Sequence, residues 1–219
     1  MNGIIFDLDG TLLNTVPDLT TAANAMLAHY GVRAITQQQV MDYLGHGLGR
    51  LVERALPSEA HIDPKEALGV FSAAYAQVYR DQTQPYAGIL ELVDELVKRR
   101  IPLAVVSNKA QPFLDGLVER HFPNVPFCAV IGERHDLPRK PDPMGLLRAV
   151  KAMGVRVDDA VLVGDTEVDA QAAMNAGMLM LGVAWGFRPV SALREAGVQR
   201  ILEHPQEMLE LINDYAIIE

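Results

Sequence analysis

The feature that most constrains the fold of this chain is an alternation of short, wholly apolar runs with longer segments of helical periodicity. The apolar runs are Gly3–Phe6, Leu103–Val106, Phe127–Ile131, Ala160–Val163 and Leu179–Val183. Runs that are apolar at every position, and not only at alternate positions, suit strands that are covered on both faces. Helical spacing marks the segments between the later runs, at 90–100, 112–121, 144–153 and 168–176. Strands and helices in this alternation predict an α/β fold built on a parallel sheet with right-handed crossovers.

One long segment, residues 15–84, departs from this alternation. Its apolar residues recur at helical spacing, and Asp18 and Gly31 fit the start and the end of a first helix. A further helix is expected to open at Asp63 and Pro64, because proline is favoured in the first turn. No apolar run of the strand type separates these helices. We therefore predict an all-helical insertion placed directly after the first strand.

Composition excludes several classes of function. Acidic residues outnumber basic ones, with 28 Asp and Glu against 19 Lys and Arg and a formal net charge of -9. Binding to nucleic acid or to an anionic membrane needs a basic surface, so neither partner is expected. The apolar runs fall far short of the about 20 residues that a membrane-spanning helix needs. Because 49% of the 219 residues are apolar, the chain is expected to bury a substantial core.

The single cysteine, Cys128, bears on where the protein works. It has no partner within the chain, so no intrachain disulfide can form and a reducing compartment is expected. The residues before Asp7 show neither the basic stretch nor the long apolar stretch of a secretion signal. We therefore expect a soluble, cytoplasmic protein.

Polar residues of the types used in catalysis follow several of the predicted strands. Asp7 and Asp9 follow the first strand, and Asp165 and Asp169 follow the fourth. Ligands bind beyond the carboxyl ends of the strands in an open parallel sheet, so we expect these four carboxylates and the side chain of Lys140 to converge at one edge. Other polar residues at these strand ends are Thr11, Ser107, Asn108, Lys109 and Thr166.

Four carboxylates in one place carry more negative charge than one lysine balances. A hard divalent cation would balance this charge, and Mg²⁺ typically binds carboxylates, carbonyls, waters and phosphate oxygens. Phosphoryl transfer requires a carboxylate nucleophile, a second carboxyl group that moves a proton, a cation and hydrogen-bond donors. An isolated Asp-x-Asp-Gly sequence is typical of a surface turn, but four such groups at strand ends favour catalysis.

Four sequence motifs, taken in order, resemble those of the haloacid dehalogenase-type (HAD-like) phosphohydrolase superfamily over nearly the whole chain. They are Phe6–Leu12 (FDLDGTL), Val106–Lys109 (VSNK), Lys140–Pro143 (KPDP) and Val163–Asp169 (VGDTEVD). Each motif alone is a weak signal, whereas the four in this order are specific. The resemblance implies a Rossmann-like parallel sheet core over residues 1–14 and 85–219, with an inserted α-helical cap domain over residues 15–84.

Two further segments resemble the phosphoglycolate phosphatases within this superfamily. They are Asn14–Leu19 (NTVPDL) at the start of the insertion and Ala184–Phe187 (AWGF) after the last predicted strand. Asn14 departs from the aspartate that is common in these relatives. It lies at the expected hinge of the insertion, so the departure bears on the subfamily more than on the reaction.

The resemblance implies a role for each catalytic residue. Asp7 would attack the phosphoryl group and become a transient aspartyl phosphate, while Asp9 would protonate the leaving oxygen and later activate water. The Asp7 carboxylate, the Asp9 main-chain carbonyl and the Asp165 carboxylate would hold Mg²⁺. The residues that would bind the substrate at the sheet edge are Thr11, Ser107, Asn108, Lys109 and Lys140. Asp169 and Thr166 would lie one layer further out, where Asp169 would orient Lys140 or a water molecule.

Several of these assignments have a structural alternative. Ser107 could cap the following helix, and Lys109 could be a solvated side chain. Asp169 could complement the N-terminus of a helix, and Lys140 could form a surface basic pair with Arg139.

The helical insertion is expected to act as a lid, because its closure over the sheet edge would exclude water and select leaving groups. Its candidate contact is the loop Gly45–Arg50, in which His46 and Arg50 could meet the substrate, Arg50 through a substrate carboxylate. A helix–helix turn with solvated side chains is the alternative. Trp185 and Phe187 are expected to pack a loop against the core.

These observations predict a Mg²⁺-dependent phosphomonoesterase that acts on a small phosphorylated metabolite, with 2-phosphoglycolate as the first candidate. Sugar phosphates, pyrophosphate and nucleotides are further candidates. A phosphomutase would share the first chemical steps, whereas a dehalogenase would need neither Asp9 nor Mg²⁺. A binding module without turnover is the alternative from another class, and the sequence is compatible with a monomer or a homodimer.

Overall fold

A computed structural model describes residues 2–45 and 47–216 of the chain. The chain forms two units. One combines Met1–Leu13 with Pro85–Glu219 and contains the large sheet, and the other, Asn14–Gln84, is helical. The chain changes unit at β2 (Leu13–Asn14) and again at β3 (Gln84–Pro85), two short strands that pair with each other. Both ends of the chain therefore contribute to the sheet-containing unit.

The large sheet has six parallel strands in the order β5-β4-β1-β6-β7-β8. Its strands are β1 (Gly3–Phe6), β4 (Leu103–Ala110), β5 (Ala129–Glu133), β6 (Ala160–Gly164), β7 (Leu179–Val183) and β8 (Arg200–Leu202). The strand β1 is central, and its Phe6 pairs with Val105 of β4 and with Val163 of β6. The direction of strand addition reverses at β1. Such a switch point is where ligands bind in open α/β sheets.

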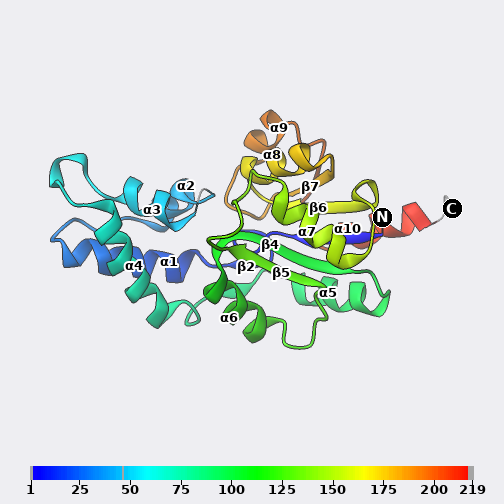
Figure 1. The fold of residues 1–219 in the computed structure, drawn as a ribbon, viewed down its shortest axis with the longest axis horizontal. Helices are drawn as coiled ribbons and strands as arrows, with labels where there is room; N and C mark the ends of the chain where they lie inside the picture. The colour runs from blue at the N-terminus through cyan, green and yellow to red at the C-terminus, as the bar shows by residue number, and fades with distance from the viewer. Residues whose placement is uncertain (1, 46, 217–219) are drawn as a thin grey trace. The chain divides into compact units, whose positions relative to one another are not determined.

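Helices cover both faces of this sheet, as Figure 1 shows. The helices α7 (Met144–Met153) and α8 (Glu167–Ala176) lie on one face, and α5 (Ile89–Lys98) and α6 (Gln111–His121) lie on the other. The same unit contains α9 (Val190–Glu195), α10 (Glu207–Ala216) and the short 3-10 helix η2 (Val157–Asp159). Two covered faces explain why the strands are apolar at nearly every position.

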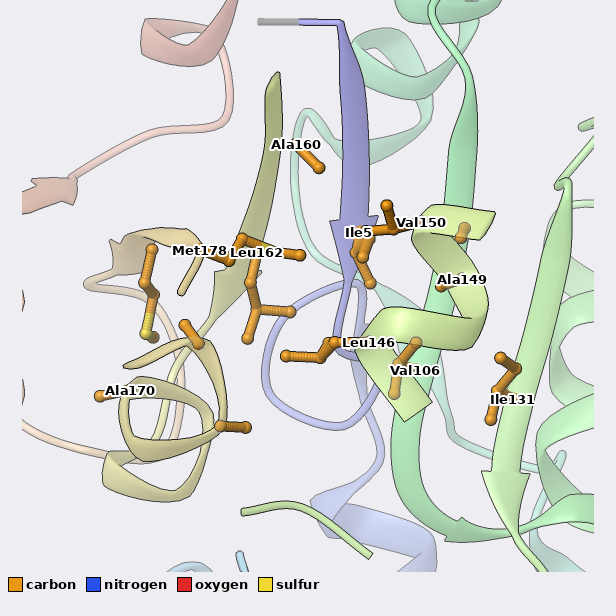
Figure 2. Close-up of a cluster of buried hydrophobic side chains, with 14 of the residues drawn as sticks. Ile5, Val106, Ile131, Leu146, Ala149, Val150, Ala160, Leu162, Ala170 and Met178 are labelled. Carbon is orange, nitrogen blue, oxygen red and sulfur yellow. The ribbon is translucent and has the colours of Figure 1, made fainter. Parts of the chain in front are cut away.

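Buried aliphatic side chains fill the layer between the sheet and the helices α7 and α8 (Figure 2). Ile5 of β1, Leu162 of β6 and Leu146 of α7 are fully buried in this cluster. Successive residues of a strand point to opposite faces, so the equally buried Ile4 and Phe6 face the layer of α5 and α6. Each such side chain contributes about 1.5–3 kcal/mol on burial. This packing fixes β1, and with it the residue that follows β1.

The second unit is built from helices. They are α1 (Val16–His29), α2 (Gln37–Tyr43), α3 (Leu48–Ala55), the 3-10 helix η1 (Ser58–Ala60) and α4 (Pro64–Val78). The helices α1 and α4 pack against each other, and the capping box formed by Thr36 and Gln39 begins α2. At the predicted helix start, the Asp63 carboxylate accepts a hydrogen bond from the Lys65 N–H and caps α4.

The buried carboxylate of Asp18 joins the two ends of this helical unit. It accepts hydrogen bonds from the main-chain N–H groups of Gln82 and Thr83, at 3.0 and 2.8 Å, and from the Thr83 hydroxyl at 2.8 Å. These bonds offset the cost of burying the carboxylate. The first turn of α1 is therefore fixed to the segment that precedes β3.

Most of the expected helices and strands are present, with small shifts at their ends. The strand expected over 103–106 extends to Ala110, so Ser107, Asn108 and Lys109 belong to β4. The strand expected from Phe127 begins at Ala129. The apolar pattern did not predict α2, α9, α10 or β8, which has only three residues. The helix expected after the loop at 45–50 is α3, which already begins at Leu48. Every helix in the described part of the chain is too short or too polar to cross a membrane.

Candidate active site

The candidate active site lies where the adjacent strands β1 and β6 end. Asp7 directly follows β1, and its main-chain N–H still donates to the Val163 carbonyl of β6 at 2.9 Å. Asp165 directly follows β6, which ends at Gly164. Asp169 lies in the first turn of α8, the helix that follows β6. The pairing of β1 with β6 therefore brings these three acidic residues together.

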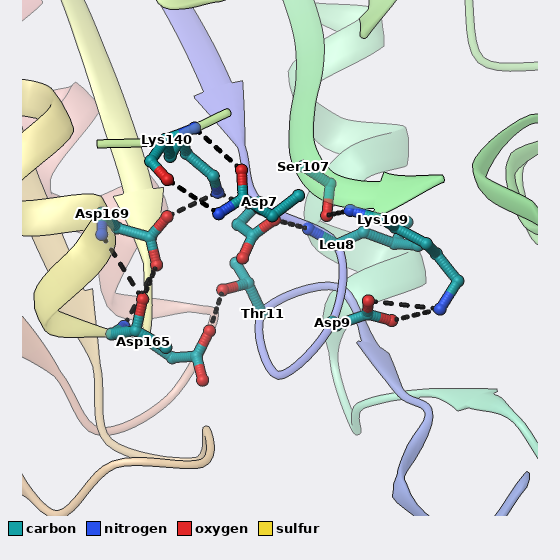
Figure 3. Close-up of polar contacts among 11 residues, drawn as sticks. Asp7, Leu8, Asp9, Thr11, Ser107, Lys109, Lys140, Asp165 and Asp169 are labelled. Atoms are coloured by element: carbon teal, nitrogen blue, oxygen red, sulfur yellow. Dashed lines mark hydrogen bonds and ion pairs between the residues drawn. The ribbon is translucent and has the colours of Figure 1, made fainter. Parts of the chain in front are cut away.

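One buried lysine bridges two of these carboxylates (Figure 3). Lys140 Nζ lies 2.5 Å from Oδ1 of Asp169 and 3.0 Å from Oδ1 of Asp7. The Lys140 side chain is only 3% exposed, whereas Arg139 is partly exposed and pairs with Glu133 at 3.4 Å. The alternative of a surface basic pair is therefore wrong for Lys140. Charges this deeply buried persist only when they are paired.

Asp165 is held in place by two other loops of the same unit. The Thr11 hydroxyl donates to its Oδ1 at 3.0 Å, and the Phe187 main-chain N–H donates to its Oδ2 at 2.8 Å. A Cβ atom on Gly186, or on Gly10 with its φ of +85°, would lie 2.2 Å from an atom of Asp165. Glycine is therefore required at both positions for the chain to approach the carboxylate. The Thr11 hydroxyl is buried against Asp165, and its contact with substrate stays a prediction.

Asp169 both begins a helix and holds Lys140. Its Oδ2 accepts hydrogen bonds from the main-chain N–H of Thr166 at 3.1 Å and from the Thr166 hydroxyl at 2.6 Å, which forms the capping box of α8. Its Oδ1 accepts from the Lys140 ammonium. The two roles that the sequence offered as alternatives for Asp169 therefore coexist.

Burial and mutual repulsion shift the pKa values of these groups. Burial raises the pKa of Asp7 to about 6, and the charges of Asp169 and Asp9 add to this effect while Lys140 opposes it. Burial, and then the charges of Asp169 and Asp7, raise the pKa of Asp165 well above its usual range. Burial lowers the pKa of Lys140, but Asp169 and Asp7 outweigh it and raise this pKa overall. The group therefore holds more negative charge than Lys140 neutralises.

The three carboxylates fit a hard divalent cation. One oxygen from each of Asp7, Asp165 and Asp169 lies within 4.8 Å of the others. These donors are all oxygen atoms, as Mg²⁺ prefers, and three carboxylates beside the one ammonium of Lys140 leave two negative charges to be balanced. Burial is the first cause of the raised pKa values of Asp7 and Asp165, and the charges of the neighbouring carboxylates add to it.

The side chain of Asp9 does not lie with the other three acids. Its two oxygens lie 3.0 and 3.2 Å from Nζ of Lys109, whose side chain is fully buried. Figure 3 shows this pair apart from the group formed by Asp7, Lys140 and Asp169. The expected convergence of four carboxylates is therefore wrong for the Asp9 side chain, because a buried ammonium on β4 holds it elsewhere. The alternative of a solvated Lys109 is wrong as well.

Ser107 and Asn108 contact other parts of the main chain. Ser107 Oγ accepts from the Lys109 N–H at 3.4 Å, and it does not cap α6, whose N-cap is Ala110. Asn108 Oδ1 accepts from the Lys140 N–H at 2.8 Å, and Asn108 Nδ2 donates to the Lys140 carbonyl at 2.9 Å. The Asn108 amide therefore binds the main chain of Lys140.

The two other expected substrate contacts belong to the helical unit. Arg50 is exposed in the first turn of α3 and forms an ion pair with Glu53 of the same helix at 2.8 Å. His46 lies outside the described residues. A contact of either residue with substrate stays a prediction.

The loop after β7 takes part in the site, which the sequence analysis did not anticipate. Trp185 Nε1 donates to the Thr11 carbonyl at 3.0 Å, and the neighbouring Phe187 N–H holds Asp165. Phe187 is buried and Trp185 is half-buried, so both pack the loop against the core as expected. The sequence signal that could have indicated this role is Gly186, which stands between two aromatic residues shortly after a predicted strand.

Comparisons with known proteins point to one family. A family model described as haloacid dehalogenase-like hydrolase matches residues 4–183. The chain is 33% identical over 218 residues to a phosphoglycolate phosphatase of Nitrosospira multiformis, which covers 97% of this chain and 96% of the relative. It is 32% identical to a phosphoglycolate phosphatase of Vibrio parahaemolyticus, with 95% of each chain covered.

Solved structures show the same fold. The crystal structure of a protein provisionally assigned as a phosphoglycolate phosphatase, from Lactobacillus delbrueckii subsp. bulgaricus, has a TM-score of 0.90 and 34% identity and covers 96% of this chain and 98% of that one. A haloacid dehalogenase-like family protein of Streptococcus pneumoniae has a TM-score of 0.86 at 21% identity. The α/β fold with a Rossmann-like parallel sheet, expected from the sequence, is confirmed.

Proposed function

The chain belongs to the haloacid dehalogenase-like hydrolase family, and on this premise we propose that it is a Mg²⁺-dependent phosphomonoesterase with 2-phosphoglycolate as its first candidate substrate. The observation that carries the proposal is the buried group in which Lys140 bridges Asp7 and Asp169. A carboxylate beside a fixed ammonium and beside oxygen ligands for a cation offers a nucleophile for phosphorus and positive charge for its oxygens. The names of the curated relatives support the choice of substrate.

In the proposed reaction, a carboxylate oxygen of Asp7 attacks phosphorus, and the bond between phosphorus and the ester oxygen breaks. The carboxyl group of Asp9 gives its proton to the leaving oxygen, which departs as an alcohol. Water then attacks the aspartyl phosphate at phosphorus, Asp9 takes a proton from this water, and the bond between phosphorus and Asp7 breaks. Orthophosphate leaves, and both carboxyl groups return to their starting states.

Lys140 and Ser107 would bind the phosphoryl oxygens. The raised pKa of Lys140 keeps its side chain protonated at neutral pH, and the contacts with Asp7 and Asp169 fix its ammonium before substrate arrives. An ammonium fixed in advance stabilises the charge that develops in an in-line transition state without reorganisation at that moment.

Mg²⁺ would be held by the carboxylates of Asp7 and Asp165 and by the main-chain carbonyl of Asp9. When bound, the cation supplies the positive charge that the three carboxylates lack. Thr11 and Phe187 orient Asp165 for this role through their hydrogen bonds to its two oxygens. Asp169, whose two oxygens are engaged by Lys140 and Thr166, would lie one layer further out.

Asp9 must leave Lys109 before it can act as the acid. Both oxygens of Asp9 face the Lys109 ammonium, which can donate hydrogen bonds but cannot accept one. In this position the Asp9 carboxyl group therefore cannot donate a proton to an ester oxygen. We assign the ion pair between Lys109 and Asp9 to the resting state, in which Asp9 is ionised; on leaving Lys109 it would take up a proton from solvent. A rotation of the Asp9 side chain would then begin the reaction.

The helical unit Asn14–Gln84 is proposed to serve as a cap domain that selects the substrate. Its loop at Gly45–Arg50 would supply the contact, with the Arg50 guanidinium binding the carboxylate of phosphoglycolate and His46 in the same loop. Exclusion of water by a cap would strengthen each charge interaction in the site. A cytoplasmic location and a state of monomer or homodimer stay predictions.

The experiment that tests this function is a phosphate-release assay on the full chain. We expect release of orthophosphate from 2-phosphoglycolate with Mg²⁺ and none with EDTA, together with loss of turnover in Asp7→Asn. Sugar phosphates, pyrophosphate and p-nitrophenyl phosphate in the same panel rank the substrates by kcat/KM. Turnover that survives EDTA, or full activity in Asp7→Asn, would overturn the proposal, and conversion of a sugar phosphate to its isomer without net release would identify a phosphomutase instead.

A further inference from the structure

Both polar atoms of the Asn108 side chain contact the main chain of Lys140. Its Oδ1 accepts a hydrogen bond from the Lys140 N–H at 2.8 Å, and its Nδ2 donates to the Lys140 carbonyl at 2.9 Å. The amide group thereby pairs with the Lys140 main chain as a neighbouring strand would. Asn108 lies in β4 between Val106 and Ala110, which pair with β5 on either side of a register shift, so this pair connects Lys140 to the end of a sheet strand.

Lys140 itself lies in an irregular segment between β5 and α7, so regular secondary structure does not fix its main chain. A second amide supports the same segment, because Asn175 of α8 donates to the Pro141 carbonyl at 2.8 Å. The lysine side chain has four rotatable bonds, and the reach of its ammonium depends on where the main chain begins. The contacts of Lys140 with Asp169 and Asp7 therefore require an anchored main chain.

We infer that Asn108 is a positioning residue, which anchors the main chain of Lys140 so that the ammonium lies between Asp7 and Asp169 before substrate binds. The inference rests on the proposed phosphatase function, since it assigns Asn108 to the group that binds phosphoryl oxygens. On this inference the Asn108 side chain does not contact the substrate directly, and it affects substrate binding by holding Lys140 in position. Displacement of a catalytic group by about 1 Å can reduce a rate by about 10²-fold.

The test is a double-mutant cycle on the full chain with Mg²⁺ present, in which Asn108→Ala is made alone and in a Lys140→Ala background. The probe is inorganic orthophosphate, whose dissociation constant is measured by calorimetry, and kcat and KM for 2-phosphoglycolate are measured in parallel. We expect Asn108→Ala to weaken orthophosphate binding about tenfold and to reduce kcat more than it raises KM. In the Lys140→Ala background, the same substitution should change orthophosphate binding less than about twofold.

A matched control is available because Asn24 makes the same kind of contact elsewhere. Its Oδ1 accepts from the Ile35 N–H at 2.8 Å and its Nδ2 donates to the Ile35 carbonyl at 3.0 Å, and both asparagines are half-buried. Asn24→Ala should lower the melting temperature about as much as Asn108→Ala does while orthophosphate binding stays unchanged. Asn108→Ser is neutral and too short to keep both contacts with the Lys140 main chain, so a loss of binding like that in Asn108→Ala is expected, and this variant is measured if Asn108→Ala does not fold.

Two outcomes would overturn the inference. Equal loss of orthophosphate binding in both backgrounds would show that the Asn108 side chain meets the phosphoryl group directly. Unchanged binding in folded Asn108→Ala and Asn108→Ser would show that the contact with Lys140 is structural only. Failure of the wild-type protein to bind orthophosphate, or to release it from any phosphomonoester, would instead overturn the proposed function. The wild-type measurement therefore separates failure of the proposed function from failure of the inference about Asn108.

Discussion

The Lys109 ammonium and the Asp9 carboxylate form an ion pair between residues 100 positions apart in the sequence, with Nζ 3.0 and 3.2 Å from the two oxygens. The Lys109 side chain is fully buried and that of Asp9 is 18% exposed. Removing one partner of a buried pair leaves the other charge without compensation. We expect Lys109→Met to lower the free energy of unfolding by about 1–3 kcal/mol, measured by urea denaturation.

An exposed ion pair of the same type serves as the control. Lys98 Nζ lies 2.6 Å from Asp94, but both side chains are about two-thirds exposed. Lys98→Met should change the free energy of unfolding by less than about 0.5 kcal/mol. Equal effects of the two substitutions would show that burial of Lys109 does not matter to stability.

Asp7→Asn should abolish turnover and yet stabilise the metal-free protein at high pH. The pKa of Asp7 is about 6 in the fold against an ordinary value of 3.8, so ionisation of this group opposes folding. The cost is absent below about pH 4, grows as the pH rises from there, and is complete above about pH 6. Because one pKa unit corresponds to about 1.4 kcal/mol, we expect Asp7→Asn to stabilise the metal-free protein by about 1–3 kcal/mol at pH 8 and by nearly nothing at pH 4.

Denaturant titrations at the two pH values in EDTA measure this difference. The exposed Asp136 provides a control, because Asp136→Asn should change stability by less than about 0.5 kcal/mol at either pH. A destabilised Asp7→Asn protein at pH 8 would contradict the assignment of excess negative charge to the site.

Mg²⁺ affinity should decrease on acidification. A proton on Asp7 must leave before its oxygen can bind the cation, and the pKa of about 6 places this competition below neutral pH. We expect the dissociation constant for Mg²⁺ to rise at least about tenfold per pH unit below pH 6, because Asp165, whose pKa is also raised, must lose its proton as well. Calorimetry in buffers of different ionisation enthalpy would count the released protons, and a pH-independent affinity between pH 5 and pH 6 would argue against Asp7 as a ligand.

Gly186→Ala should disturb the cation site through Asp165. The added Cβ would lie 2.2 Å from the Cβ of Asp165, so one of the two chain segments must move. We expect Mg²⁺ affinity and kcat each to fall at least about tenfold, because sub-ångström placement of ligands is required. The control is Gly69→Ala in α4, where a Cβ has open space and alanine favours the helix by about 0.5–1 kcal/mol. Wild-type Mg²⁺ affinity in Gly186→Ala would refute the close approach.

Arg50→Met should distinguish substrates with a carboxylate from those without one. Arg50 is an exposed residue paired with Glu53, so the substitution should leave stability nearly unchanged. If its guanidinium binds the carboxylate of 2-phosphoglycolate, kcat/KM for this substrate should fall about 10- to 100-fold. The value for p-nitrophenyl phosphate should stay within about twofold, and equal losses for both substrates would remove Arg50 from substrate recognition.

Local sequence pattern was sufficient to predict the α/β fold and the meeting of Asp7 and Asp165, but not the part that Phe187 takes in the site. Apolar runs such as Ala160–Val163 are strands because two covered faces leave no solvated side, and the motif residues Asp7 and Asp165 meet because parallel strands end at a common edge. The resemblance to haloacid dehalogenase-type phosphohydrolases, drawn from four short motifs, is confirmed. The short strand β8 was missed because three residues carry too little periodicity to be recognised.

Only the tertiary structure decided which side chains within the site pair with each other. The motifs place Asp9 and Lys109 near the sheet edge, but they do not predict that the two side chains form an ion pair apart from Asp7. Nor do they predict that Asn108 binds the main chain of Lys140. Hydrogen bonds and ion pairs depend on distances of a few tenths of an ångström and on the direction of each side chain, whereas sequence periodicity reports only which face a residue occupies. The sequence by itself therefore determined the fold and which motif residues lie at the sheet edge, and the packing of distant segments decided the partners of their side chains.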